Sequence, residues 1–103
     1  MNKNNRTIKK NVYLLRKILQ FNRIRILLLL EEGEMCACEL VEELKLPNNL
    51  VSHHLKTLSD LGILKSRKLG LHRKYTIKKN KKELVSKLIK CFKSFSYNNE
   101  KQN

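Results

Sequence analysis

The spacing of apolar residues changes from a helical to a strand period near Gly62, before a last helical stretch, and that change limits the fold more than any other feature. Before Gly62, apolar residues recur at three- and four-residue steps, the period of a helix with one buried face. After it, the runs 63–68 and 72–77 alternate apolar and polar residues, as strands do. Gly70 between the runs supplies a tight turn. The fold is therefore expected to be mainly α with a small β-hairpin wing.

Helix boundaries follow from capping residues and breakers. Thr7 is expected to cap a first helix and Asn22 a second, because Thr and Asn side chains accept hydrogen bonds from helix N-termini. Gly33 ends the second helix, and Pro47 suits the start of a later one, where its missing N–H costs little. Three further helices are predicted over 38–46, 48–62 and 84–95.

The length of 103 residues suits one domain, and no repeat or linker divides it. We expect one domain over 1–96 and a disordered polar tail over 97–103. No apolar run approaches the roughly 20 residues of a membrane span. Three cysteines, an odd number, do not suggest a disulfide framework. A cytoplasmic protein with reduced thiols is therefore expected.

The formal net charge is +14, which favours polyanionic partners, nucleic acid before an anionic membrane. The charge is unevenly spread along the chain, because residues 1–30 contain no acid. Six of the nine acids form an acidic island around Cys36 and Cys38. The six are Glu31, Glu32, Glu34, Glu39, Glu42 and Glu43.

Two short helices joined by a tight turn and followed by a basic hairpin indicate a winged helix-turn-helix. The second helix of such a pair reads base edges in the major groove, while basic side chains on the wing neutralise phosphates. His54 lies beside Leu55, so a structural role is at least as plausible for it as a DNA contact. The expected DNA-binding residues are Asn48, Asn49, Ser52, His53 and Lys56 on the helix and Arg67, Lys68, Arg73 and Lys74 on the wing.

The segment "LVEELKLPNNLVSHHLKTLSDLGILKSRKLGLHRKYTI", residues 40–77, resembles the DNA-binding core of the arsenic-responsive repressor family, ArsR/SmtB. "NRIRIL", residues 22–27, resembles the second helix of that family. The resemblance implies a homodimeric repressor that pairs through its first and last helices. It also implies a near-palindromic DNA operator, from which a metal ion or another thiol-reactive signal releases the protein.

"EMCACEL", residues 34–40, resembles the box of the family members that sense soft metals, and the match falls on Cys36 and Cys38. Where some members have a third cysteine, this chain has Val41. Thiolates select soft ions, so the candidate effectors are As(III), Sb(III), Cd(II), Pb(II) and Cu(I). No constitutive cofactor is implied. The last helix lacks the His positions that other members use for zinc.

The spacing of the two cysteines sets a condition on such a site. Residues two apart in a regular helix point about 200° away from each other. Cys36 and Cys38 can therefore grip one ion only if Cys36 is extended ahead of the helix. The alternative is that both are small packed residues without a ligand. Cys91, beside Phe92 on the last helix, is expected to be a packing residue in the dimer interface.

Two other functions compete with metal sensing. One is a winged-helix DNA-binding protein that senses nothing, and the other is a basic RNA-associated adaptor. An enzyme is not expected, because Ser52 and its neighbouring histidines lie on an outward face with no orienting acid.

Overall fold

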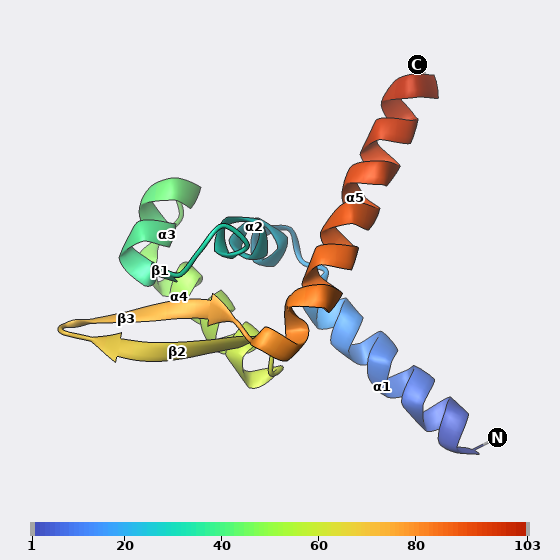
Figure 1. Cartoon of the computed structure of the whole chain (residues 1–103), viewed down its shortest axis with the longest axis horizontal. Coiled ribbons are helices and arrows are strands. Elements are labelled where there is room, and N and C mark those ends of the chain that lie inside the picture. The colour runs from blue at the N-terminus through green and yellow to red at the C-terminus, as the bar shows by residue number, and fades with distance from the viewer. Residues whose placement is uncertain (1, 103) are drawn as a thin grey trace.

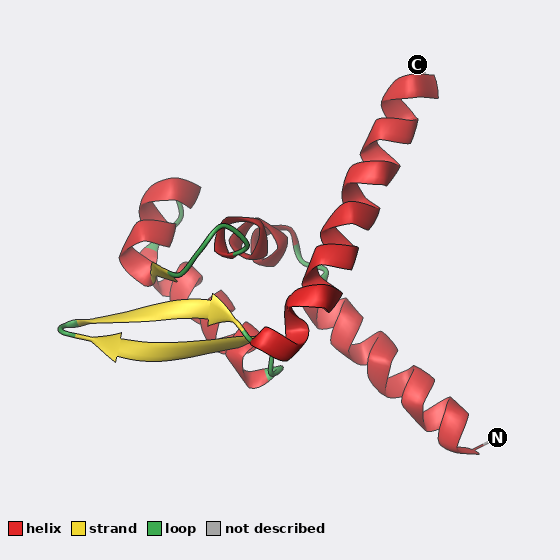
Figure 2. Cartoon of the chain, viewed as in Figure 1, coloured by secondary structure: helices red, strands yellow, loops and turns green. Residues whose placement is uncertain are grey.

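A computed structural model describes the backbone of residues 2–102 and the side chains of residues 4–95. The fold is mainly helical with a small antiparallel sheet, as predicted (Figure 2). The helices are α1 (Asn2–Ile18), α2 (Phe21–Leu30), α3 (Ala37–Leu44), α4 (Asn48–Asp60) and α5 (Lys82–Gln102), and a 3-10 turn, η1 (Lys79–Lys81), precedes α5. The strands are β1 (Met35–Cys36), β2 (Leu64–Leu69) and β3 (His72–Ile77).

The sheet contains the predicted hairpin and one strand that was not predicted. β2 and β3 pair around Gly70, whose φ of 64° is the positive value that a two-residue hairpin turn requires. β1 pairs with the other edge of β3, so the strand order is β1-β3-β2. In that pairing Met35 lies opposite Tyr75, and Cys36 lies opposite Lys74. The start of α3 is thereby attached to the hairpin.

The core lies between α2, α3, α4 and the base of the hairpin. Ile26, Leu40, Val51 and Leu58 are fully buried there, at 0% exposure. Each such side chain stabilises the fold by about 1.5–3 kcal/mol through the apolar surface it removes from water. This core fixes α3 and α4 relative to each other and to the sheet.

Two predicted helix starts were wrong. α2 is capped by the side chain of Gln20, which accepts a hydrogen bond from the Arg23 N–H at 3.1 Å. Asn22 lies inside the first turn of α2, where its carboxamide oxygen accepts from Arg25. α1 begins at Asn2, well before Thr7, since no glycine or proline interrupts the chain there.

α1 and α5 project from the body in different directions (Figure 1). The radius of gyration is 15.3 Å, larger than the roughly 13 Å of a compact chain of this length.

None of the described helices combines the length and the apolarity that crossing a membrane would require. The boundary predicted at residue 96 stays a prediction, because the side chains beyond Phe95 lie outside the described residues.

Candidate nucleic-acid interface and thiol site

α3 and α4 form the helix-turn-helix around a turn at Lys45. Lys45 adopts a left-handed conformation, with a φ of 58°, and caps the C-terminus of α3. Arg25 of α2 donates a hydrogen bond to the Leu44 carbonyl at 3.0 Å, which satisfies one of the acceptors left free at that helix end. α2 therefore holds the turn that sets the angle of α4.

α4 presents its polar residues outward, as its apolar spacing predicted. Its buried side includes His54, which is 3% exposed, so His54 has a structural position. Its Nδ1 accepts a hydrogen bond from Arg23 Nε at 3.1 Å. Burial, followed by the nearby charges of Arg23 and His53, lowers the pKa of His54. The residues of α4 that were predicted to contact DNA are all exposed, namely Asn48, Asn49, Ser52, His53 and Lys56.

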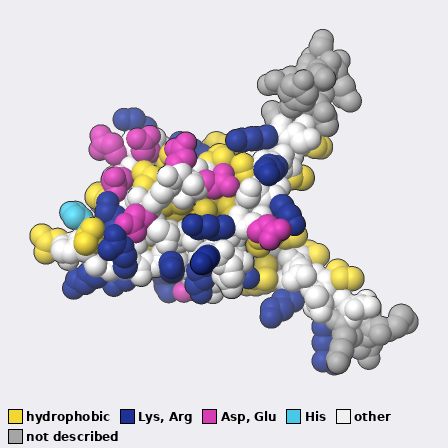
Figure 3. Space-filling model, viewed as in Figure 1, with side chains coloured by type: hydrophobic (Ala, Val, Ile, Leu, Met, Phe, Trp, Pro, Cys, Tyr) yellow, Lys and Arg dark blue, Asp and Glu magenta, His cyan; other side chains and the backbone are white. Residues whose placement is uncertain are grey.

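The strand register divides the basic residues of the wing between two faces. Lys68 and Arg73 are cross-strand partners and so share one face of the hairpin. Arg67 and Lys74 are also partners and share the opposite face. Figure 3 shows carboxylates gathered over α3 beside a band of Lys and Arg side chains along the hairpin.

The two faces differ in how their cations are paired. Arg67 binds Glu34 through two hydrogen bonds, and Lys74 binds Glu39 at 2.8 Å. The hydrogen bond from Arg67 lowers the pKa of Glu34, and the one from Lys74 lowers that of Glu39. On the other face, Arg73 donates to the Ser66 hydroxyl at 2.9 Å, a neutral partner. Two of the four predicted phosphate contacts thus already have a carboxylate.

Cys36 stands at the start of α3 in the extended conformation that the spacing of the cysteines required. Its φ is −85° and its ψ is 165°. Its Sγ accepts a hydrogen bond from the Glu39 N–H at 3.4 Å, while Glu39 Oε1 accepts from the Cys36 N–H at 2.9 Å. The two residues form a capping box with sulfur in the place of the usual hydroxyl.

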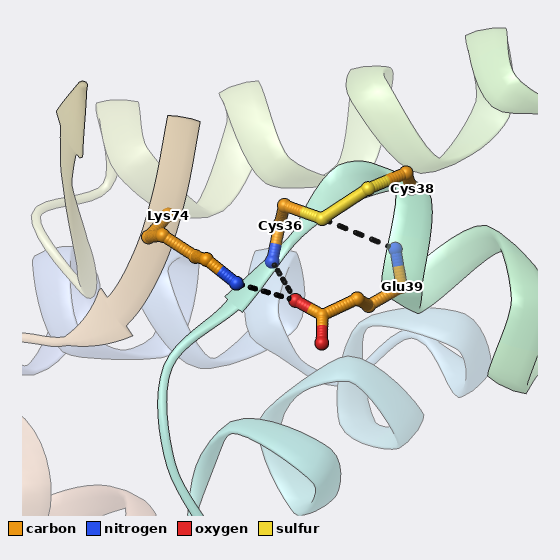
Figure 4. The surroundings of a disulfide bond; sticks show 4 residues. All are labelled: Cys36, Cys38, Glu39 and Lys74. Carbon is orange, nitrogen blue, oxygen red and sulfur yellow. Dashed lines mark hydrogen bonds and ion pairs between the residues drawn. A yellow bond between two sulfur atoms is a disulfide. The ribbon is translucent and has the colours of Figure 1, made fainter. Parts of the chain in front are cut away.

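The expectation of reduced thiols was wrong for this pair, because Cys36 and Cys38 are joined in a disulfide (Figure 4). The extended Cys36 allows it, since the Cα atoms lie 5.3 Å apart, within the usual range for a disulfide of about 4.4–6.8 Å. The same closeness would let the reduced sulfurs reach one ion.

His72 lies beside this pair, which the sequence had not indicated. The two Sγ atoms and a ring nitrogen of His72 all lie within 4.8 Å of one another. The reason is the sheet register. Lys74 pairs with Cys36, and His72, two residues before Lys74, points to the same face of β3. No pattern in the sequence indicates this proximity, since β1 has only two residues and no alternation.

Cys91 is a free thiol that is exposed in the single chain, so its predicted packing in the dimer interface stays a prediction. It lies on α5 among other exposed apolar residues, including Leu84, Phe92 and Phe95. Among the described residues, the group that could hold a metal ion contains Cys36, Cys38 and His72 but not Cys91.

Comparisons with known proteins agree with this architecture. The model of the bacterial regulatory protein arsR family matches residues 22–66. An uncharacterised HTH-type transcriptional regulator of Methanocaldococcus jannaschii is 43% identical over 68 residues, which cover 65% of this chain and 76% of that protein. The arsenical resistance operon repressor of Staphylococcus xylosus is 39% identical over 56 residues, and the match spans 54% of each chain.

A solved structure, that of the transcriptional regulator HlyU from Vibrio vulnificus, has a similar fold. It superimposes with a TM-score of 0.74 at 27% identity, over 89% of this chain and 99% of its own length. All these proteins are regulators of transcription rather than enzymes, in agreement with the expectation from the sequence. The chain therefore belongs to the arsR family of bacterial regulatory proteins, which are winged helix-turn-helix transcriptional repressors.

Proposed function

We propose that the chain is a homodimeric repressor that binds a near-palindromic DNA operator and leaves it when a soft metal or metalloid ion binds Cys36 and Cys38. The observation that carries this proposal is the position of the cysteine pair at the first turn of α3, the helix that supports α4. A relative is named as an arsenical resistance operon repressor, which supports an effector of this class. Such a regulator works in the cytoplasm, where the operator is.

Base readout is assigned to the N-terminal half of α4. Asn48 and Asn49 begin this helix, and Ser52, His53 and Lys56 follow on its exposed side. An Asn side chain can bond an adenine edge through two hydrogen bonds, a contact that distinguishes bases. The relatives regulate transcription, which favours duplex DNA over RNA as the partner.

Phosphate contacts are assigned to the wing, first to Lys68 and Arg73. Neither is paired with a carboxylate in the described part of the chain, so both charges are available to DNA. Arg67 and Lys74 must share their charge with Glu34 and Glu39. We therefore assign them weaker phosphate contacts, strengthened only if the carboxylates move.

The dimer interface is assigned to the apolar surfaces of α1 and α5. Phe95 is 70% exposed and Ile8 is 60% exposed, a costly arrangement for a lone chain. A second copy of the chain would cover the apolar surfaces of α1 and α5, and would place two α4 helices on one side of the dimer. A symmetric protein of this kind requires a near-palindromic operator. The large apolar residues that are exposed on α1 and α5 are Ile8, Val12, Tyr13, Leu84, Phe92 and Phe95.

The residues of the thiol site fit a soft ion once the disulfide is reduced. Cys36 and Cys38 would then offer two thiolates, which soft ions prefer. The N-terminus of α3 stabilises a thiolate, and the surrounding carboxylates favour a cation. When bound, the ion would supply a positive charge and fixed bonds to both sulfurs.

The capping box explains how binding at Cys36 could reach DNA. Its Sγ accepts a hydrogen bond from the Glu39 N–H, so a metal ion bonded to that sulfur would compete with the hydrogen bond that caps α3. Glu39 in turn holds Lys74 of β3. A change at the cap therefore alters both the helix that supports α4 and the strand that carries the wing, which gives the two states that a switch needs.

The test uses reduced protein and a DNA duplex obtained by selection from random sequence. As(III) or Cd(II) should weaken DNA binding by at least about fivefold, the lower end of typical coupling between two sites. The double variant Cys36→Ser, Cys38→Ser should bind the same DNA without responding. Release of that variant by either ion would show that the site is elsewhere. If no ion affects the parent, the chain is a regulator that does not sense metals.

A further inference from the structure

We infer that His72 is the third ligand of the thiol site, and that the site takes a thiophilic divalent cation such as Cd(II) or Zn(II). This inference rests on the proposed function, since it assigns a further ligand to the same two cysteines. It adds a residue of the wing to a site that otherwise belongs to the helix-turn-helix alone.

His72 lies at a distance from the two cysteines that is close to the spacing of ligands in a metal site. Three atoms bonded to one ion at about 2.3 Å lie roughly 3.8–4.0 Å from one another. The ligand atoms of Cys36, Cys38 and His72 lie within 4.8 Å of one another. In the reduced protein the two sulfurs are no longer bonded and would move apart to the distance between two ligands of one ion, with the His72 nitrogen within reach of the same ion.

The sheet holds His72 in place for this role. β1 pairs Cys36 with Lys74, and the alternation of β3 turns His72 and Lys74 to the same face. Cys38 and His72 are exposed while Cys36 is buried, so the site is open on one side to an incoming ion.

The ligand types favour a divalent cation over As(III). Two thiolates and one neutral imidazole carry two negative charges, which a divalent cation neutralises; binding from the thiol form releases two protons. Imidazole and thiolate together suit Zn(II) and its heavier relative Cd(II). The adjacent pair of Lys74 and Glu39 is neutral overall and does not oppose the cation. Solvent can occupy a fourth position.

With His72 as a ligand, the bound ion would be bonded directly to a residue of the hairpin. His72 is the first residue of β3 and directly precedes Arg73, one of the two phosphate contacts assigned above. An ion shared by Cys36, Cys38 and His72 would fix the hairpin tip relative to the start of α3. Cysteine ligands alone would reach the hairpin only indirectly, through the cap and the ion pair of Glu39 with Lys74.

The test measures Cd(II) affinity by competition with a chelator, and counts ligands by X-ray absorption, on reduced full-length protein without DNA. His72→Ala should lose the nitrogen ligand, keep two sulfurs, and bind Cd(II) at least about tenfold more weakly. His72→Cys should restore tight binding and raise the sulfur count by one. Leu71→Ala, a change at a fully exposed neighbour in the hairpin turn, should behave as the parent does.

The outcomes separate this inference from the proposed function. If His72→Ala binds Cd(II) as tightly as the parent, with an unchanged ligand count, His72 is not a ligand and the two-cysteine site remains. If Cys36→Ser, Cys38→Ser also binds Cd(II) as the parent does, the thiol site itself is wrong. Cys91→Ala should keep the sulfur count at two, and a loss of one sulfur in that variant would overturn the assigned ligand set.

Discussion

Cys36 and Glu39 cap α3 reciprocally: Cys36 Sγ accepts the Glu39 N–H at 3.4 Å, and Glu39 Oε1 accepts the Cys36 N–H at 2.9 Å. A thiol is a weak acceptor compared with the hydroxyl or carboxylate that usually stands at this position. A residue chosen only to start a helix would therefore be Ser or Asp. The use of sulfur here favours a second role for Cys36.

The two roles of Cys36 can be separated by substitution. Cys36→Ala removes the cap and should lower the free energy of unfolding by about 0.5–2 kcal/mol. Cys36→Ser keeps a hydrogen-bond acceptor and should be at least as stable as the parent under reducing conditions. Both variants should lose the response to Cd(II). Urea denaturation of the reduced proteins measures the first effect, and equal stability of the two variants would contradict the capping role.

The two faces of the wing should differ in how DNA binding depends on salt. Arg73→Ala should reduce the slope of log K against log salt concentration by about 0.9, the value of one phosphate contact. Arg67→Ala should reduce it by less, because Arg67 already binds Glu34. Titrations at several salt concentrations test this. A larger effect of Arg67→Ala would mean that DNA displaces Glu34.

A charge on the exposed stripe of α5 should break the dimer. Phe92 is 43% exposed in the single chain and lies on the surface assigned to the second copy. Phe92→Glu should weaken dimerisation by at least about tenfold, or 1.4 kcal/mol, as measured by analytical ultracentrifugation. Leu71→Glu, a matched change on the wing, should leave the dimer intact. A parent that is monomeric at micromolar concentration would refute the proposed dimer.

His54 should make the fold sensitive to mild acid. Burial, then the charges of Arg23 and His53, place its pKa in the folded protein below the ordinary 6.5. The unfolded chain therefore takes up a proton first, and the free energy of unfolding falls as the pH drops from 6.5 toward the folded-state pKa. His54→Gln stays neutral and should lose less stability than the parent between about pH 7.5 and pH 5.5. Urea midpoints measure this, and parallel losses would contradict it.

Elements set by local sequence were the predictable ones. The spacing of Val51, Leu55 and Leu58 fixed the buried side of α4, and Gly70 marked the hairpin turn. The start of α2 was missed because Gln20 and Asn22 can both cap a helix, and tertiary contacts decide between them. The predicted place of Cys91 in a dimer interface stays a prediction, because the periodicity of a helix does not reveal whether a partner covers its apolar side.

The thiol site was predictable only in part, for a physical reason. Cys36 and Cys38 are close in sequence, so their spacing alone required an extended Cys36. His72 reaches them through the pairing of β1 with β3, and that register depends on the whole of α3, α4 and β2 between them. Pairing over such a separation leaves no mark in either segment. The carboxylate partners of Arg67 and Lys74 were missed for the same reason.

The pairing of Cys36 with Lys74 closes a loop that contains α3, α4 and β2. The entropy of closing a loop changes slowly with its length, so what happens at the junction matters more than how long the loop is. β1 contributes only two residues to the strand pairing that closes this large loop. A crosslink between the paired strands at this junction would restrict the motion of every element inside the loop, namely α3, α4 and β2. The helix-turn-helix is thus held at both ends by one pairing, and an ion bound at Cys36 under the proposed function would act where this loop closes.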